Sequence, residues 1–135
     1  MYKRFLMLAG FCCMVLLSKS QKLQGSDNVV IGSIDADGFV KDEIGKVDGR
    51  FKKDGMVLGK SDIIIGYLKI DGEVHDEAHK LIGYIRLDGT CQDPNNKIIG
   101  YVKEDGTVQN ENKLTIGFAK GVPLKWAAAY FFFLF

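Results

Sequence analysis

The sequence predicts an all-β fold: a five-fold ring of short antiparallel β-hairpins, built from 17-residue repeats and closed by an apolar C-terminal segment. Three observations predict this fold. A glycine returns at intervals of 17 residues, an Asp-Gly pair follows each of the first five such glycines, and the last ten residues carry no charge. Repeats too small to bury their own apolar face are expected to pack against their neighbours.

Residues 1–20 predict a secretory signal peptide. After a short basic start they contain an apolar run over residues 5–17, and Ser18 and Ser20 are small residues at the positions that a signal peptidase inspects. The run is shorter than the roughly 20 apolar residues of a membrane-spanning helix. We therefore expect cleavage before Gln21, export to the periplasm or the cell surface, and no transmembrane helix in the mature chain.

Removal of this segment changes the charge of the protein. The full chain has 18 basic and 17 acidic residues; three of the basic residues lie in residues 1–20, which leaves 15 basic and 17 acidic residues. Nucleic-acid-binding proteins carry a basic patch or stripe, so we expect no nucleic acid partner. Of the three cysteines only Cys91 follows residue 20. The domain over residues 21–135 must then depend on its core rather than on internal disulfides.

The repeat is defined by its glycines and its Asp-Gly pairs. The glycines are Gly32, Gly49, Gly66, Gly83, Gly100 and Gly117. The pairs are Asp37-Gly38, Asp54-Gly55, Asp71-Gly72, Asp88-Gly89 and Asp105-Gly106. Apolar residues fill the columns one residue before, two after and eight after the glycine, with Asp48 as the exception in the first of these columns. The first five glycines anchor five repeat units.

Each unit predicts a β-hairpin, and the fourth shows it most clearly. Its strand-forming run over residues 82–87, which is rich in β-branched and aromatic residues, ends at Asp88-Gly89, a strong signal for a tight hairpin turn. A short second strand follows, and a polar turn over residues 92–97 leads to the next unit. The leading glycine weakens its strand, so its recurrence indicates a crowded position where a side chain does not fit.

An isolated hairpin is marginally stable in water, so each unit must pack against the next. Five equal units favour a closed ring, which limits exposed strand edges. The alternative is an open solenoid, which requires a cap at each end.

The C-terminal segment over residues 117–135 departs from the repeat, because no Asp-Gly pair follows Gly117. Residues 126–135 are uncharged, contain the only tryptophan, and are too few for a membrane-spanning helix. We interpret them as a buried strand or plug that closes the fold. Docking or self-association through residues 126–135 is the alternative.

These features resemble the five-fold β-flower proteins of Bacteroides-type bacteria. The resemblance rests on the repeated Ile-Gly-Tyr-x-x-x-Asp-Gly-Thr pattern and on the ending from Thr115 through Trp126 to Phe133, and it covers nearly the whole mature chain. It implies a signal peptide followed by a five-fold ring of β-hairpins, with no assigned activity and no functional residues to transfer. Asp48 and the irregular second unit over residues 45–60 depart from the pattern, as does Cys91 in a valine column.

No combination of residues predicts catalysis, a cofactor or a metal. His75 and His79 are four apart, a spacing that converges on a helix, whereas this segment is expected at a strand end and turn. Turn formation explains the Asp-Gly aspartates, because a calcium loop needs further oxygen ligands. Cys91 lies in an inward column and is expected to be an inert buried thiol. We expect no enzyme and no catalytic residues.

Tyr67, Tyr84 and Tyr101 occupy one column, directly after the glycine, and are the candidate ligand-binding residues. Two interpretations remain open. The rings pack between adjacent hairpins, or they form a repeated aromatic surface that stacks on sugars. The sequence therefore predicts an exported non-enzymatic structural or binding module for an unknown protein or glycan, with multivalent carbohydrate binding as the alternative.

Overall fold

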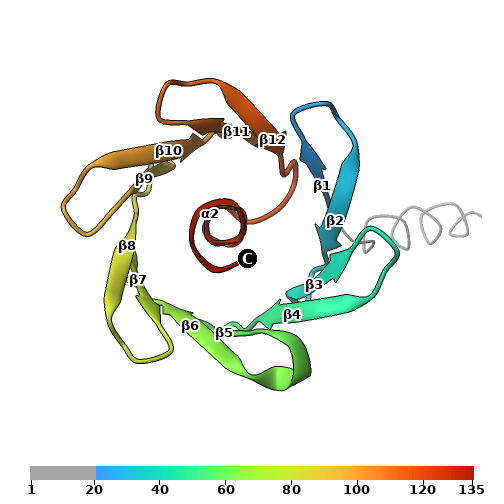
Figure 1. The fold of residues 1–135 in the computed structure, drawn as a ribbon, viewed down its shortest axis with the longest axis horizontal. Helices are drawn as coiled ribbons and strands as arrows, with labels where there is room; N and C mark the ends of the chain where they lie inside the picture. The colour runs from blue at the N-terminus through green and yellow to red at the C-terminus, as the bar shows by residue number, and fades with distance from the viewer. Residues whose placement is uncertain (1–20) are drawn as a thin grey trace, which may run out of the picture.

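The computed structural model describes residues 21–135, and the predicted signal peptide over residues 1–20 lies outside the described residues. Apart from short helices, the described chain is all-β, and its antiparallel strands close into a barrel-like ring (Figure 1). The prediction of a closed ring is confirmed. The open solenoid is wrong, because a solenoid leaves two strand edges unpaired and this ring leaves none.

Twelve strands make up the ring in residues 21–135. They are β1 Gln21–Gly25, β2 Val30–Ile34, β3 Phe39–Asp42, β4 Val47–Phe51, β5 Met56–Leu58, β6 Ile64–Leu68, β7 Glu73–Asp76, β8 Leu81–Ile85, β9 Thr90–Gln92, β10 Ile98–Val102, β11 Thr107–Asn110 and β12 Thr115–Phe118. Strands that are neighbours in the ring are also neighbours in the chain, except for β1 and β12.

The pairing of β1 with β12 closes the ring. Strand β12 carries Gly117, the sixth repeated glycine, which lies opposite Gly25 of β1. On the other side of β1, the fully buried Leu23 lies opposite Gly32. Because no Asp-Gly turn follows Gly117 to supply a hairpin partner, the N-terminal strand takes that place. The sequence patterns gave no indication of a strand at residues 21–25.

The Asp-Gly pairs form tight turns, as the turn over residues 69–73 shows. The amide of Gly72 donates to the carbonyl of Lys69 over 3.1 Å, and the amide of Lys69 donates to the carbonyl of Glu73 over 2.9 Å. Gly72 has a φ of 97°, in the left-handed region that favours glycine. The carboxylate of Asp71 accepts the Glu73 amide over 3.0 Å. Glycine thus supplies the backbone conformation and aspartate supplies an acceptor for the turn.

Each repeat contains a β-bulge at the residue before its glycine. In the pairing of β7 with β8, Val74 lies opposite Gly83 and His75 opposite Leu81, so Ile82 has no partner. The same shift occurs in the other units, and the residues left without a partner are Ile31, Asp48, Ile65, Ile82, Ile99 and Ile116. The last four pack against the core. A bulge re-aims the side chain of its extra residue, which explains how an isoleucine next to an inward-facing glycine also faces inward.

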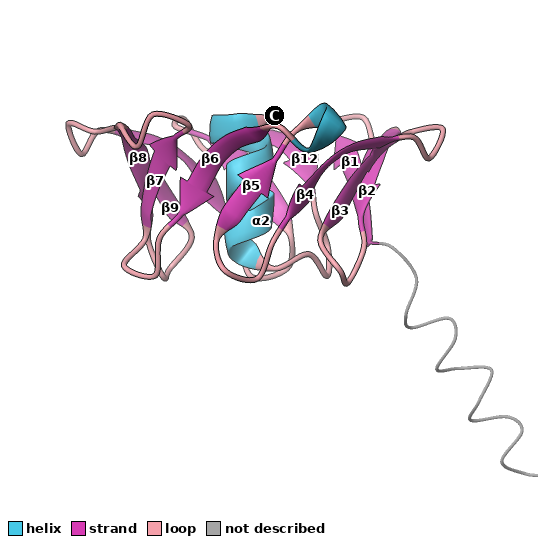
Figure 2. Ribbon diagram, turned by 90° about the horizontal axis from the view of Figure 1, so that it is seen from below, coloured by secondary structure: helices cyan, strands magenta, loops and turns pink. Residues whose placement is uncertain are grey.

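The C-terminal segment lies inside the ring as a helix (Figure 1). The α-helix α2 spans Leu124–Ala129 and continues as the π-helix η2 over Tyr130–Leu134. It runs along the axis of the ring, and the C-terminus lies at one end of that axis (Figure 2). Of the two forms that we expected for this segment, a buried strand or a plug, the strand is therefore wrong. Alanine has the highest helix propensity, and Ala127, Ala128 and Ala129 are fully buried where small side chains fit on the axis.

Residues 131–135, at the end of the central helix, face successive repeated glycines of the ring. A β-carbon added to Gly117 would collide with the ring of Phe131, and one added to Gly100 with the ring of Phe132. The further matches, in the same order, are Phe133 with Gly83, Leu134 with Gly66 and Phe135 with Gly49. The same β-carbons would also collide with a backbone carbonyl of the adjacent strand. The crowding inferred from the glycine spacing therefore arises from both the central helix and the neighbouring strand.

The second unit is irregular, as its sequence indicates. Its outer turn contains a short 3₁₀ segment, η1, over Lys60–Asp62. Among residues 21–135, no helix is both long enough and apolar enough to span a membrane.

Candidate functional site

The five Asp-Gly turns lie at one end of the ring, which we call the Asp-Gly face. They comprise residues 35–38, 52–55, 69–72, 86–89 and 103–106. They lie at the same end because each follows a strand that runs in the same direction; the other turns lie at the opposite end, which we call the outer-turn face (Figure 2). The second residue of each turn forms its tip. The tips are Ala36, Lys53, Ile70, Leu87 and Glu104.

The central helix begins at the Asp-Gly face. The Lys125 ammonium donates to the carbonyls of Lys69 and Ile70, over 3.2 and 3.5 Å. The indole of Trp126 stacks on the buried ring of Phe51, with a centroid distance of 5.6 Å and an interplanar angle of 11°. These contacts fix the start of the helix against the second and third units.

A hollow of about 380 Å³, which we call the Trp126 hollow, opens beside this indole on the Asp-Gly face. Its volume is typical of small-molecule sites. The apolar part of its wall consists of Leu68, Ile70, Pro123 and Trp126. The charged groups at its rim are Lys52, Lys53, Asp54 and Lys125. None of these three lysines lies within 4.0 Å of a carboxylate in the described residues.

Two further hollows also have Ile70 in their lining. One, of about 600 Å³, lies between the third and fourth turns and includes Leu87 and Lys125. The other, of about 610 Å³, extends up the wall to His75. The Asp-Gly face therefore offers an apolar and aromatic surface beside amino groups that have no carboxylate partner. Such a surface suits a molecule with an apolar body and an acidic group.

The predicted ligand-binding residues Tyr67, Tyr84 and Tyr101 lie elsewhere, half-buried on the outer wall. The structure places their rings at equivalent positions of β6, β8 and β10. Each ring is covered by a basic side chain. The His79 imidazole stacks on Tyr67 at 4.4 Å, the Arg86 guanidinium lies 4.8 Å from the centroid of Tyr84, and Lys113 lies 5.6 Å from that of Tyr101. A stacked imidazole therefore occupies one face of Tyr67, and cation–π contacts do the same for Tyr84 and Tyr101.

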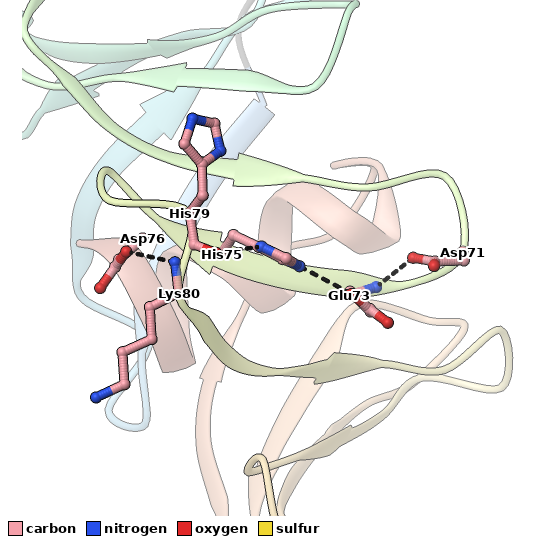
Figure 3. Close-up of polar contacts among 6 residues, drawn as sticks. All are labelled: Asp71, Glu73, His75, Asp76, His79 and Lys80. Carbon is pink, nitrogen blue, oxygen red and sulfur yellow. Dashed lines mark hydrogen bonds and ion pairs between the residues drawn. The ribbon is translucent and has the colours of Figure 1, made fainter.

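The two histidines do not converge on one point (Figure 3). The His75 ring lies between Glu73 Oε1, 2.8 Å from Nε2, and the carbonyl of His79, 3.0 Å from Nδ1. The His79 ring points away from His75 (Figure 3). Asp76 is occupied as the acceptor of its own turn, taking the Lys80 amide over 2.9 Å. Among the described residues, no group of three or more potential metal-ligating side chains comes together.

The Asp-Gly aspartates act on their own turns. Hydrogen bonds from the backbone amide and the hydroxyl of Thr90 hold the pKa of Asp88 below its usual range, and Thr107 has the same effect on the pKa of Asp105. Cys91 is fully buried, and desolvation together with the charge of Asp88 raises the pKa of its thiol to about 12. A thiol in that state is a poor nucleophile at neutral pH.

Sequence reasoning missed the Trp126 hollow. The signal present was a lysine next to the only tryptophan, just after Pro123, at the start of an otherwise uncharged segment. The rest of the hollow comes from the second and third units. No spacing in the sequence indicates which units the C-terminal segment faces, so the set of residues that lines the hollow could not be predicted.

The sequence over residues 20–135 matches the family model described as 5-fold beta-flower protein. No curated protein and no solved structure matches the chain.

Proposed function

The chain belongs to the five-fold β-flower family, and on that premise we propose that it is an exported, non-enzymatic binding module that holds its ligand in the Trp126 hollow. One observation carries the proposal: the only tryptophan of the chain forms the wall of an apolar hollow whose rim carries three lysines without carboxylate partners. The basic start and apolar run of residues 1–20 support export to the periplasm or the cell surface.

The ligand class follows from this lining. Trp126, Leu68 and Pro123 offer apolar area, and burial of apolar area contributes about 25 cal/mol per Å². Lys53 and Lys125 offer amino groups to a carboxylate or a phosphate. The ligand is therefore an acidic amphiphile, with its apolar part against the indole and its acidic group at the lysines.

The repeat supplies the scaffold. In this proposal five equivalent hairpins, each with an Asp-Gly turn, make up the tandem part of the ring, and a sixth pair forms from β12 and β1. The equivalent bulges support this division, and in the second to fifth units so does the match of each glycine with a central-helix residue. Because the hairpins are alike, specificity must come from the parts that differ between units, namely the turn tips and the side of the central helix that each unit faces.

The indole provides the test. Sodium dodecanoate, titrated below its micellar concentration, should change the emission of Trp126 saturably, whereas the uncharged dodecanol should respond more weakly. Lys125→Gln should weaken dodecanoate binding by roughly tenfold, the equivalent of about 1.4 kcal/mol. Lys97→Gln, on the outer-turn face, is the matched control and should bind as the unchanged protein does. An unsaturable response, or equal affinity in the two variants, would overturn the proposal.

Carbohydrate binding by Tyr67, Tyr84 and Tyr101 is the second candidate. Its support is that three tyrosines lie at equivalent positions of the outer wall and are not fully buried. The basic side chains over the rings must move before a sugar can stack there. A glycan array is the direct test: hits that disappear in Tyr84→Ala support this function, and an array without hits removes it.

Self-association through residues 126–135 remains a proposal, but the structure limits the surface that this segment offers to a second copy. Most of this segment faces the interior of the ring, and Phe135 is the residue of it that is exposed, at 42%. Sedimentation equilibrium of the unchanged protein and of Phe135→Ser tests whether that side chain joins two copies.

A further inference from the structure

Two adjacent tips of the Asp-Gly face carry large apolar side chains that almost nothing in the protein covers. Ile70 is 99% exposed and Leu87 is 98% exposed. They are the two most exposed large hydrophobic residues in the part of the chain that the structure describes. Scattered exposed apolar residues are ordinary on protein surfaces. These two differ by the degree of their exposure, since Ile44, the next most exposed, is 82% exposed, and they occupy the same position in neighbouring turns of one face.

The turns hold both tips rigidly. Gly72 and Gly89, with φ of 97° and 92°, each donate back across their own turn, over 3.1 and 3.0 Å. Lys125 of the central helix donates to the carbonyl of Ile70 itself. The two side chains are therefore presented outward by fixed backbone, with no flexible loop that would fold them back onto the protein.

Around the two tips, lysine ammonium groups extend outward, whereas the turn carboxylates are held close to the backbone. Lys53 forms the tip next to Ile70, and Lys52 and Lys125 line the hollow beside it. The nearby acids Asp54, Asp71 and Asp88 each accept a backbone amide of their own turn, which keeps these carboxylates close to the backbone. Lysines, by contrast, have long stems that reach outward.

We propose that the Asp-Gly face docks on a membrane surface, with the Ile70 and Leu87 side chains inserted among the acyl chains and the Lys53 and Lys125 ammonium groups against lipid phosphates. Protruding apolar tips beside amino groups suit a lipid interface, which deforms around convex groups and carries anionic phosphates. A second copy of this chain fits less well, because it would have to offer a matching recess to both tips. The proposal does not depend on a soluble ligand in the Trp126 hollow.

The experiment is co-sedimentation with vesicles of phosphatidylcholine and phosphatidylglycerol in a 70:30 ratio. The protein is produced by export, and mass spectrometry verifies that its N-terminus follows residue 20, so that the apolar run of residues 5–17 does not contribute. The double variant Ile70→Ser, Leu87→Ser should bind at least tenfold more weakly. Ile44→Ser, at a residue 82% exposed in an outer turn, is the matched control and should bind unchanged.

Two further variants separate insertion from a structural effect. The conservative exchange Ile70→Leu, Leu87→Ile keeps the apolar area and should restore binding, and thermal unfolding of all variants should coincide because neither tip is packed. Vesicles of pure phosphatidylcholine should bind more weakly if the lysines contact anionic lipid. Equal binding by the double serine variant, or no binding by the unchanged protein to either vesicle, would overturn the proposal. So would loss of self-association in that variant without any vesicle binding, which would identify a second copy as the occupant.

Discussion

The ring of Phe132 lies in the space that a β-carbon on Gly100 would need. The same relationship joins each of five consecutive C-terminal residues, 131–135, to a repeated glycine, and the glycines follow one another backwards along the chain. The central helix therefore places one side chain against each of five repeated glycines, those of the second to fifth units and Gly117 of β12, and the missing β-carbons make room for these side chains. Close packing of this kind makes the interior sensitive to added volume.

Gly100→Ala tests that sensitivity. The new methyl group would meet both Phe132 and the carbonyl of Gln109, so the free energy of unfolding should fall by roughly 1–3 kcal/mol or more. Urea denaturation measures it. Gly25→Ala is the control, because its β-carbon would come no closer than 3.4 Å to Asp27 and its backbone is not left-handed. Equal loss in both variants would mean that glycine serves strand flexibility and not close packing.

The one-to-one order of helix residues and units makes a separate prediction. Combining Gly100→Ala with Phe132→Leu should give a coupling energy of about 0.5–3 kcal/mol, because the smaller side chain relieves the collision. Combining Gly100→Ala with Phe133→Leu should be additive, since Phe133 faces Gly83. Double-mutant cycles in urea measure both. Coupling in the second pair as large as in the first would contradict the observed order.

Deletion of residues 126–135 should abolish folding or cause aggregation. Single Phe→Ala changes in a core cost about 3–5 kcal/mol, and the deletion removes several such side chains from a fold whose total stability is on the order of 5–15 kcal/mol. Circular dichroism and size-exclusion chromatography of the truncated chain are the measurements. Deletion of Phe135 alone, a partly exposed residue, should leave a folded protein. A soluble, folded truncation would instead make the tail a docking element.

The ring itself is predictable from the sequence, because the apolar columns and Asp-Gly turns repeat in register. Val74 and Val108 are fully buried, as their column predicts, and so is Cys91. Strand β1 is not predictable in this way, since residues 21–25 contain neither the repeated glycine nor an Asp-Gly pair and only Leu23 as an apolar side chain. Its partner is set by closure of the ring, which is a property of the whole chain.

The central helix shows a second limit. Its residues Tyr130 to Phe133 are aromatic, a type enriched in strands, whereas Ala127 to Ala129 favour a helix. Local propensity therefore does not distinguish a helix from a strand in this segment. Every strand of the enclosing ring is already paired on both sides, so a strand inside the ring would leave its backbone amides and carbonyls without partners. A helix satisfies these groups internally. The Trp126 hollow is formed in part by that helix, so it could not be predicted from the sequence either.

The turn aspartates make a prediction for acid pH. Asp88 and Asp105 have pKa values below the usual range, chiefly because they accept the amides of Thr90 and Thr107. Folding thus favours the charged carboxylates, so their stabilising effect is present above the pKa of the unfolded chain and is lost as pH falls through the folded pKa. In NMR titrations, Thr90→Val, which removes the hydroxyl donor of Thr90 and keeps its amide, should move the pKa of Asp88 upward and leave that of Asp105 unchanged. Movement of both would argue against local hydrogen bonds as the cause.

Cys91 makes the corresponding prediction for alkaline pH. Burial raises its pKa from 9.0 to about 12, so folding favours the protonated thiol. The contribution to stability is complete below the pKa of the unfolded chain and declines as pH rises from there toward about 12, by roughly 1.4 kcal/mol per pH unit. Cys91→Val should remove that part of the alkaline decline, and at pH 7 it should cost less than about 1.5 kcal/mol, since valine fills this column in four other units. Urea denaturation from pH 8 to 11 compares the two proteins.

Mass spectrometry after iodoacetamide treatment should find Cys91 unlabelled in the folded protein at pH 8 and labelled in urea. Rapid labelling of the folded protein, or parallel alkaline declines in the two proteins, would show that the thiol is accessible and that its pKa is near the ordinary value.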